Sequence, residues 1–100
     1  MKIWFDDLRP MPEEFDIWIK TSEECMAFIL EHSTKIELIS FDHDLGGEDT
    51  AIPVAKMLER LAYFNEINPI KWRVHSANPE GKRNLIAALR KADEYWEMHN

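Results

Sequence analysis

Cysteine and long apolar runs are nearly absent from this chain of 100 residues. Cys25 is the only cysteine, so an internal disulfide, a zinc ribbon and a redox-active cysteine pair are all excluded. The apolar run at residues 3–5 ends at two aspartates, which is too short for a signal-peptide core or a membrane span. We therefore expect a cytoplasmic protein without a membrane partner.

Glycine and basic residues are also scarce. The chain has 3 glycines and no low-complexity tract, so no interior linker or repeat is expected. The 12 lysines and arginines face 19 aspartates and glutamates, which gives a formal charge of −7. Binding to a nucleic-acid backbone relies on an excess of cations, so we expect no such partner. The 45% of hydrophobic residues can form one core, which predicts a single globular domain over residues 1–100.

Apolar runs rich in β-branched and aromatic residues alternate with segments of helical periodicity. Strands are expected at residues 2–5, 15–20, 36–41 and 70–75. Helices are expected to begin after the N-caps, which are Thr21, either Asp49 or Thr50, and Asn78. Strands separated by helices favour parallel pairing with right-handed crossovers, and a ligand site then forms at the carboxyl ends of the strands.

Three of the four predicted strands end in polar clusters: Asp6-Asp7, Asp42-His43-Asp44 and His75-Ser76-Ala77-Asn78. At one edge of a sheet, Asp6, Asp7 and Asp42 would repel one another unless protons or a cation intervened. Carboxylate oxygens suit Mg²⁺, or Mn²⁺ in its place, so we expect a metal site formed by Asp6, Asp7, Asp42 and Asp44. The alternative is that these acids only form the turns that follow the strands.

Histidines and cations near the same edge are candidates for catalysis and phosphate binding. His43 and His75 are candidate acid–base groups because an imidazole titrates near neutral pH, although His75 could instead be a packed, hydrogen-bonded core residue. Guanidinium groups, hydroxyls and helix N-termini bind phosphate. The candidate contacts to a small phosphate-containing ligand are Arg9, Ser76, Asn78, Lys82 and Arg83. Asn78 can equally be only a helix cap, and Lys82 and Arg83 only surface cations.

Three stretches of the sequence resemble one known family: FDDLRPMP at the start, SFDHDLGG in the middle and VHSANPEGKRN near the end. They are similar to the motifs of the cyclic-phosphate processing receiver domain family, over nearly the whole chain. The resemblance implies a receiver-type, flavodoxin-like fold. It also implies that Asp6 and Asp7 match the acidic pair that binds Mg²⁺, Asp42 the aspartate phosphorylated in response-regulator receivers, and Ser76 the hydroxyl residue after their fourth strand.

Some positions depart from an ordinary receiver. Receivers have a fifth strand that ends in a phosphate-contacting lysine, and no such strand is expected after the last helix here, so Lys82 or Arg83 is expected to supply that charge. Ala51 follows Thr50 where the family pattern has glycine. Ordinary receivers also lack His43 and His75, and these two histidines favour hydrolysis over phospho-signalling.

The motifs together predict a three-layer α/β domain with a four-stranded parallel sheet, ordered 2-1-3-4, and helices on both faces. The expected activity is Mg²⁺-dependent hydrolysis of a cyclic or nucleotide-derived phosphate, with Asp42 as a nucleophile or only a metal ligand. One alternative is a non-enzymatic phospho-receiver or nucleotide-binding module. Another is an acidic interaction protein, such as a phage could encode, that inhibits a host DNA-binding enzyme.

Overall fold

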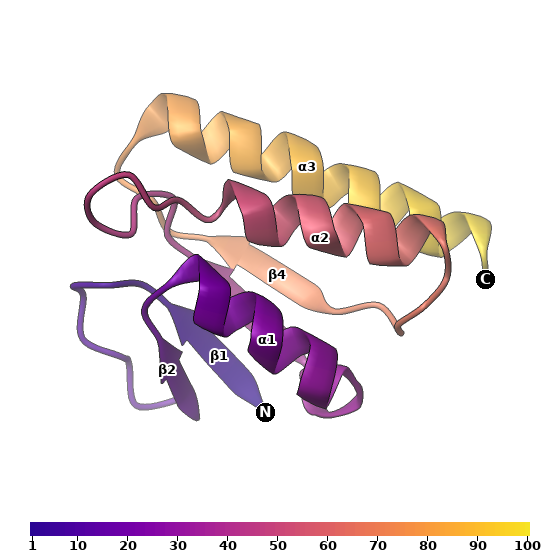
Figure 1. Cartoon of the computed structure of the whole chain (residues 1–100), viewed down its shortest axis with the longest axis horizontal. Helices are drawn as coiled ribbons and strands as arrows, with labels where there is room; N and C mark the ends of the chain where they lie inside the picture. The colour runs from indigo at the N-terminus through magenta and orange to yellow at the C-terminus, as the bar shows by residue number, and fades with distance from the viewer.

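The computed structural model describes all residues, 1–100, as a parallel sheet packed against helices (Figure 1). The elements are β1 (Lys2–Phe5), β2 (Ile17–Ile19), α1 (Ser22–His32), the short 3₁₀ helix η1 (Ser33–Lys35), β3 (Leu38–Phe41), α2 (Ile52–Tyr63), β4 (Lys71–Val74) and α3 (Pro79–Met98). All strand pairs are parallel, and the strand order is β2-β1-β3-β4. The predicted α/β class and strand order are confirmed.

Two of the predicted helix caps are present. Thr21 Oγ1 accepts a hydrogen bond from the Glu24 N–H at 3.2 Å, and the hydroxyl also bonds to Glu24 Oε1 at 3.0 Å. Asn78 Oδ1 accepts from the Gly81 N–H at 3.1 Å. These bonds satisfy N–H groups that have no partner within α1 and α3, so local sequence decides where both helices begin.

The start of α2 differs from the prediction. Neither Asp49 nor Thr50 is the N-cap; Ala51 occupies that position without a capping side chain. Asp49 instead accepts hydrogen bonds from the N–H and the hydroxyl of Ser22, at 2.9 and 2.5 Å. The Asp49 carboxylate, one of the two candidate caps of α2, is therefore bonded to the first turn of α1 instead. This contact connects the segments at which the two helices begin.

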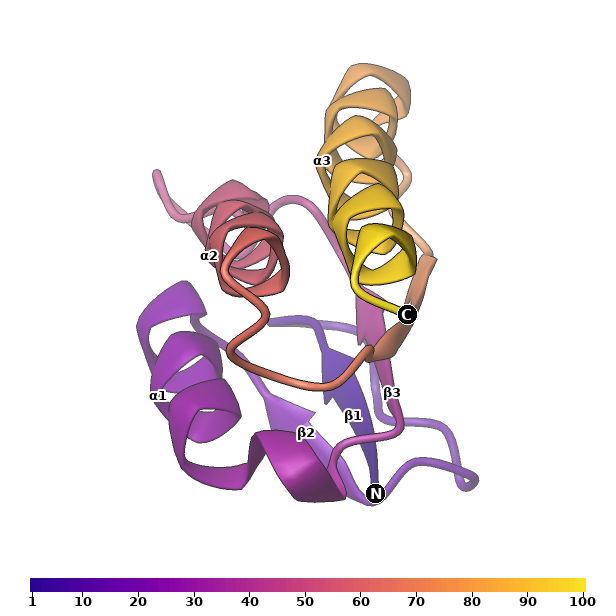
Figure 2. The same ribbon diagram turned by 90° about the vertical axis from the view of Figure 1, so that its right-hand side faces the viewer.

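All three helices cover the same face of the sheet (Figure 2). Side chains of β1 and β3 on that face share one core with buried residues of α1, α2 and α3. The prediction of three layers with helices on both faces is therefore corrected to two layers. The connections through α1 and α2 cross the sheet in the same direction, from β2 to β3 and from β3 to β4. Right-handed crossovers in one direction lie on one face.

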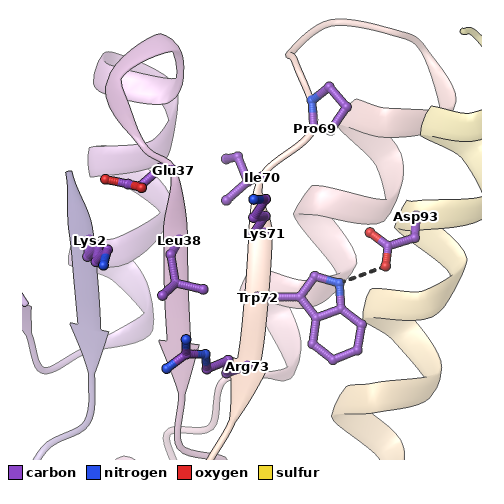
Figure 3. A pocket seen from close by; sticks show the side chains of 9 residues that line it. All are labelled: Lys2, Glu37, Leu38, Pro69, Ile70, Lys71, Trp72, Arg73 and Asp93. Carbon is purple, nitrogen blue, oxygen red and sulfur yellow. Dashed lines mark hydrogen bonds between the residues drawn. The ribbon is translucent and has the colours of Figure 1, made fainter.

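The opposite face is covered by the loop of residues 6–16, because the connection from β1 to β2 contains no helix. Phe15 from this loop packs edge-on against Trp4, with ring centroids 5.1 Å apart, and Met11 joins this small cluster. Beyond the loop, the face carries Lys2, Lys71 and Arg73 around a shallow hollow of about 550 Å³ (Figure 3). None of the predicted site residues lines this hollow.

The last helix contributes a long apolar face to the core. Leu85, Leu89, Ala92 and Trp96 are all buried, as their helical spacing predicts. Trp96 is 3% exposed, which agrees with a packing role for this tryptophan. No helix of the structure has both the length and the hydropathy needed to cross a membrane.

Asp93 of α3 lies beside β4 at the edge of the sheet. Its Oδ2 accepts a hydrogen bond from Trp72 Nε1 at 3.0 Å (Figure 3). Burial raises the pKa of Asp93, the Trp72 hydrogen bond lowers it by less, and the charge of Glu97 raises it further. The folded state therefore holds a proton on Asp93 at pH values where the unfolded chain has lost it.

We predict that Asp93→Asn raises the melting temperature at pH 7. Because the pKa is raised in the folded protein, stability falls as pH rises through the window between the ordinary pKa of 3.8 and the higher folded value. The amide removes this loss and still accepts from Trp72. Thermal melts from pH 3 to pH 7 should show a gain that disappears towards pH 3. Glu66→Gln, at an exposed position, is the control, and an equal gain at pH 3 would contradict the explanation.

Candidate metal and phosphate site

Three carboxylates meet at the carboxyl ends of β1 and β3. Asp6 and Asp7 directly follow β1, and Asp42 directly follows β3, its neighbour in the sheet. The Asp42 N–H donates to the Phe5 carbonyl at 2.8 Å, so the sheet pairing continues up to this acid. One oxygen from each of the three carboxylates lies within 4.8 Å of the others. The structure thus brings together three of the four acids that the sequence proposes as metal ligands.

Asp6 is fully buried, and both of its carboxylate oxygens have donors. Oδ1 accepts from the Leu8 and Arg9 N–H groups at 2.8 and 2.9 Å, and Oδ2 accepts from His75 Nε2 at 2.9 Å. Burial alone raises the pKa of Asp6, but the hydrogen bonds from Arg9, Leu8 and His75 together outweigh it and lower the pKa below its ordinary value. Asp6 is therefore an ionised carboxylate inside the protein, held by three donors.

The carboxylates of Asp7 and Asp42 accept fewer hydrogen bonds than that of Asp6. No hydrogen bond or ion pair binds the Asp7 carboxylate, and Asp42 accepts one bond, from the His43 N–H at 2.8 Å. Gly46 lies close to Asp7: a Cβ at this glycine would be 3.1 Å from Asp7 Oδ2, and its φ of +87° also disfavours a side chain. The donor set is entirely hard oxygen, and two carboxylates have free lone pairs. This fits Mg²⁺ or Mn²⁺.

Asp44 bonds to other side chains and does not join the three carboxylates. Its Oδ1 lies 3.0 Å from His43 Nδ1, and its Oδ2 accepts from Asn78 Nδ2 at 3.3 Å. The His43 bond and then the Asn78 bond hold the pKa of Asp44 below its ordinary range. Asp44 is absent from the group of converging acids. Its contacts instead orient the imidazole of His43 against the start of α3.

His43 is the histidine with a free ring nitrogen near the acids. Nδ1 pairs with Asp44, whereas Nε2 has no hydrogen-bond partner, and the side chain is 13% exposed. The ring lies directly over Gly81 in the first turn of α3. A Cβ at Gly81 would be only 2.5 Å from His43 Cγ, so the glycine makes room for the imidazole.

His75 has partners on both ring nitrogens. Nε2 bonds to Asp6, and Nδ1 lies 2.8 Å from Ser40 Oγ. The ring also stacks on Trp4, with centroids 4.0 Å apart and an interplanar angle of 4°. This is the packed, hydrogen-bonded histidine that the sequence leaves open as an alternative to an acid–base group.

Arg9 and Ser76 lie at the edge of the same site. Arg9 Nη1 donates to the His75 carbonyl at 2.6 Å, which fastens the loop after β1 to the end of β4. Ser76 Oγ accepts from the Asn78 N–H at 3.1 Å, so its own hydroxyl hydrogen is available to a ligand. Asn78 is occupied as the cap of α3 and as a donor to Asp44, and both ends of its amide are used.

Lys82 and Arg83 follow Gly81 in the first turns of α3. Both side chains are exposed, and neither forms an ion pair. The first turn of α3 adjoins the site through His43. The structure shows no contact between either cation and the three carboxylates.

Sequence reasoning missed three residues that shape the site: Trp4, Ser40 and Gly81. Two of them carried a readable signal. Ser40 is a polar residue within an otherwise apolar strand, and Gly81 is a glycine within a helix, which commonly marks a close approach of another group. The stacking of Trp4 on His75 had no such signal, because these residues are far apart in the sequence.

We predict that the effect of Gly81→Ala on stability changes sign with residue 43. In the wild-type background the new methyl group collides with His43 and should cost about 1–3 kcal/mol of unfolding free energy. In a His43→Ala background the collision is absent, and the substitution should stabilise the helix by up to about 1 kcal/mol. Denaturant unfolding of the four proteins gives the coupling between the two sites. Stabilisation in both backgrounds would refute the contact.

A family model described as the cyclic-phosphate processing receiver domain matches residues 1–91. No curated protein and no solved structure matches the chain. The matched residues include every predicted site residue, from Asp6 to Arg83.

Proposed function

We propose that this chain, which belongs to the cyclic-phosphate processing receiver domain family, is a metal-dependent hydrolase of a cyclic or nucleotide-derived phosphate ester. Family membership indicates a phosphate-related role. The observation that carries the finer proposal is the convergence of Asp6, Asp7 and Asp42, with one oxygen of each within 4.8 Å of the others. A cation bound there would relieve the repulsion among the three carboxylates and would attract a phosphate.

Asp7 and Asp42 would hold the metal ion with their free oxygens, beside the buried Asp6. When bound, Mg²⁺ supplies positive charge that neutralises a phosphate and aligns it for attack. Gly46 supports this assignment because its missing side chain leaves space beside Asp7 Oδ2. Asp44 is left out of the proposed ligand set, since its carboxylate bonds to His43 and Asn78.

His43 is the proposed acid–base group. Asp44 engages Nδ1, so Nε2 is the nitrogen free to transfer a proton to or from the substrate or an attacking water. The alternative offered by the sequence, His75, has both nitrogens engaged. Around these groups, Arg9, Ser76 and Lys82 are the proposed donors to phosphate oxygens, because their hydrogen-bonding capacity is not exhausted within the protein.

Metal binding tests the ligand set directly. We predict that the wild-type protein binds Mn²⁺, followed by electron paramagnetic resonance, and that Mg²⁺ competes for the site. Asp42→Asn and Asp7→Asn should each weaken Mn²⁺ binding by roughly 10–100-fold or more, because each removes a charged oxygen donor. Asp44→Asn is the matched control and should bind Mn²⁺ as the wild type does. Equal losses in Asp44→Asn and Asp42→Asn would refute the assignment.

Turnover tests the reaction class. We predict that a screen of cyclic nucleotides and other cyclic phosphates, with Mg²⁺ or Mn²⁺, reveals hydrolysis that Asp42→Asn abolishes. His43→Gln should lower kcat by about 10²–10⁴-fold, the usual contribution of a general acid or base. Absence of any turnover, together with labelling of Asp42 by acetyl phosphate, would instead identify a phospho-receiver and overturn the proposed hydrolysis.

A further inference from the structure

A chain of hydrogen bonds connects the interior of β3 to the proposed metal site. Ser40 Oγ lies 2.8 Å from His75 Nδ1, and His75 Nε2 lies 2.9 Å from Asp6 Oδ2. Ser40 belongs to β3, His75 follows β4 and Asp6 follows β1. The His75 side chain, at the end of β4, thus reaches across the end of β3 to Asp6 at the end of β1. Ser40 and Asp6 are 3% and 0% exposed, so both ends of this series of hydrogen bonds are shielded from water.

The direction of the hydrogens in this chain follows from the chemistry of its members. An ionised carboxylate only accepts hydrogen bonds, so His75 Nε2 must carry the hydrogen that reaches Asp6. The Nδ1 of a neutral imidazole is then an acceptor, and the Ser40 hydroxyl is its donor. Asp6 therefore requires the tautomer of a neutral His75 that donates from Nε2, and Ser40 supports this tautomer by donating to the second nitrogen. Such support by the partner of the second nitrogen is a common role of groups behind a metal site.

The His75 ring is also held in one orientation by its surroundings. Trp4 stacks flat on it, and Trp4 Nε1 donates to the Arg9 carbonyl at 2.9 Å. Arg9 in turn donates from Nη1 to the His75 carbonyl and from its N–H to Asp6 Oδ1. These contacts form a closed set around the Asp6 carboxylate, which is fixed by backbone donors on one oxygen and by His75 on the other.

We infer that Ser40 and His75 are positioning residues, which act through Asp6 to set the geometry of the metal site. Ser40 is too buried to touch a substrate, and His75 has no free nitrogen with which to transfer a proton. The link from Asp6 to a metal ion rests on the proposed function. The hydrogen bonds that join Ser40, His75 and Asp6 do not.

The metal-free protein tests the chain by itself. In ¹⁵N-histidine NMR spectra, the signals of His75 are assigned by their loss in His75→Gln. We expect the hydrogen on Nε2, and an Nδ1 signal that shows an accepted hydrogen bond. Ser40→Ala should move the Nδ1 signal towards that of an unbonded acceptor, and Ser40→Thr, which keeps the hydroxyl, should restore it. A hydrogen on Nδ1, or an Nδ1 signal unchanged in Ser40→Ala, would overturn the inference.

Mn²⁺ affinity tests what the chain does. His75 and Ser40 fix Asp6 beside the two proposed ligands, and loss of a group behind a metal site typically weakens metal binding by about 10–100-fold, so we expect losses of up to this order in His75→Gln and Ser40→Ala. Ser40→Thr should recover most of the affinity, a rescue that simple loss of packing would not produce. Ser33→Ala, in η1, is the matched control and should bind as the wild type does. Thermal melts of each variant confirm folding before titration.

The results separate the two proposals. A wild-type protein that does not bind Mn²⁺ overturns the proposed function, and with it the role of the chain at a metal site. A wild-type protein that binds Mn²⁺, and loses binding in Asp42→Asn, keeps the proposed function. If Ser40→Ala and His75→Gln then bind Mn²⁺ as tightly as the wild type, the positioning role alone is overturned.

Discussion

The constraint on which this site depends is the burial of an ionised carboxylate, Asp6. A charge without access to water is costly unless hydrogen bonds replace its hydration. The loop after β1 must therefore turn back so that the N–H groups of Leu8 and Arg9 reach Oδ1, and β4 must present His75 to Oδ2. Trp4 and Ser40 then fix the imidazole. The site is built outward from one buried charge.

The missing second layer of helices explains how the loop comes to take part. A parallel sheet is usually covered on both faces. Here the only connection on the second face is residues 6–16, because the helical crossovers step the other way across the sheet. The loop does two jobs: Phe15 and Met11 shield Trp4, while Arg9 crosses to the end of β4. In this domain, residues 6–16 therefore both cover one face of the sheet and form part of the site.

Local sequence predicts much of this molecule, and its limits have a physical cause. Strand positions, the caps Thr21 and Asn78, and the acids at strand ends follow from patterns within a few residues. The distant residue that a given side chain contacts does not follow from such local patterns. Asp49 forms hydrogen bonds with Ser22, 27 residues away, and His75 forms one with Asp6, 69 residues away. Such partners depend on how loops and strand ends that are far apart in the sequence meet in three dimensions, which local patterns leave open.

The three acids of the site differ in the number of hydrogen bonds that their carboxylates accept from the protein. Asp6 already has three donors, so its charge is compensated within the protein itself. Asp7 has none and Asp42 has one, from the adjacent backbone. The negative charge that the protein does not compensate therefore lies on Asp7 and Asp42, next to the fixed carboxylate of Asp6. The donors around Asp6 are explained by folding alone, whereas the half-buried Asp7 and Asp42 keep free oxygens that the fold does not use.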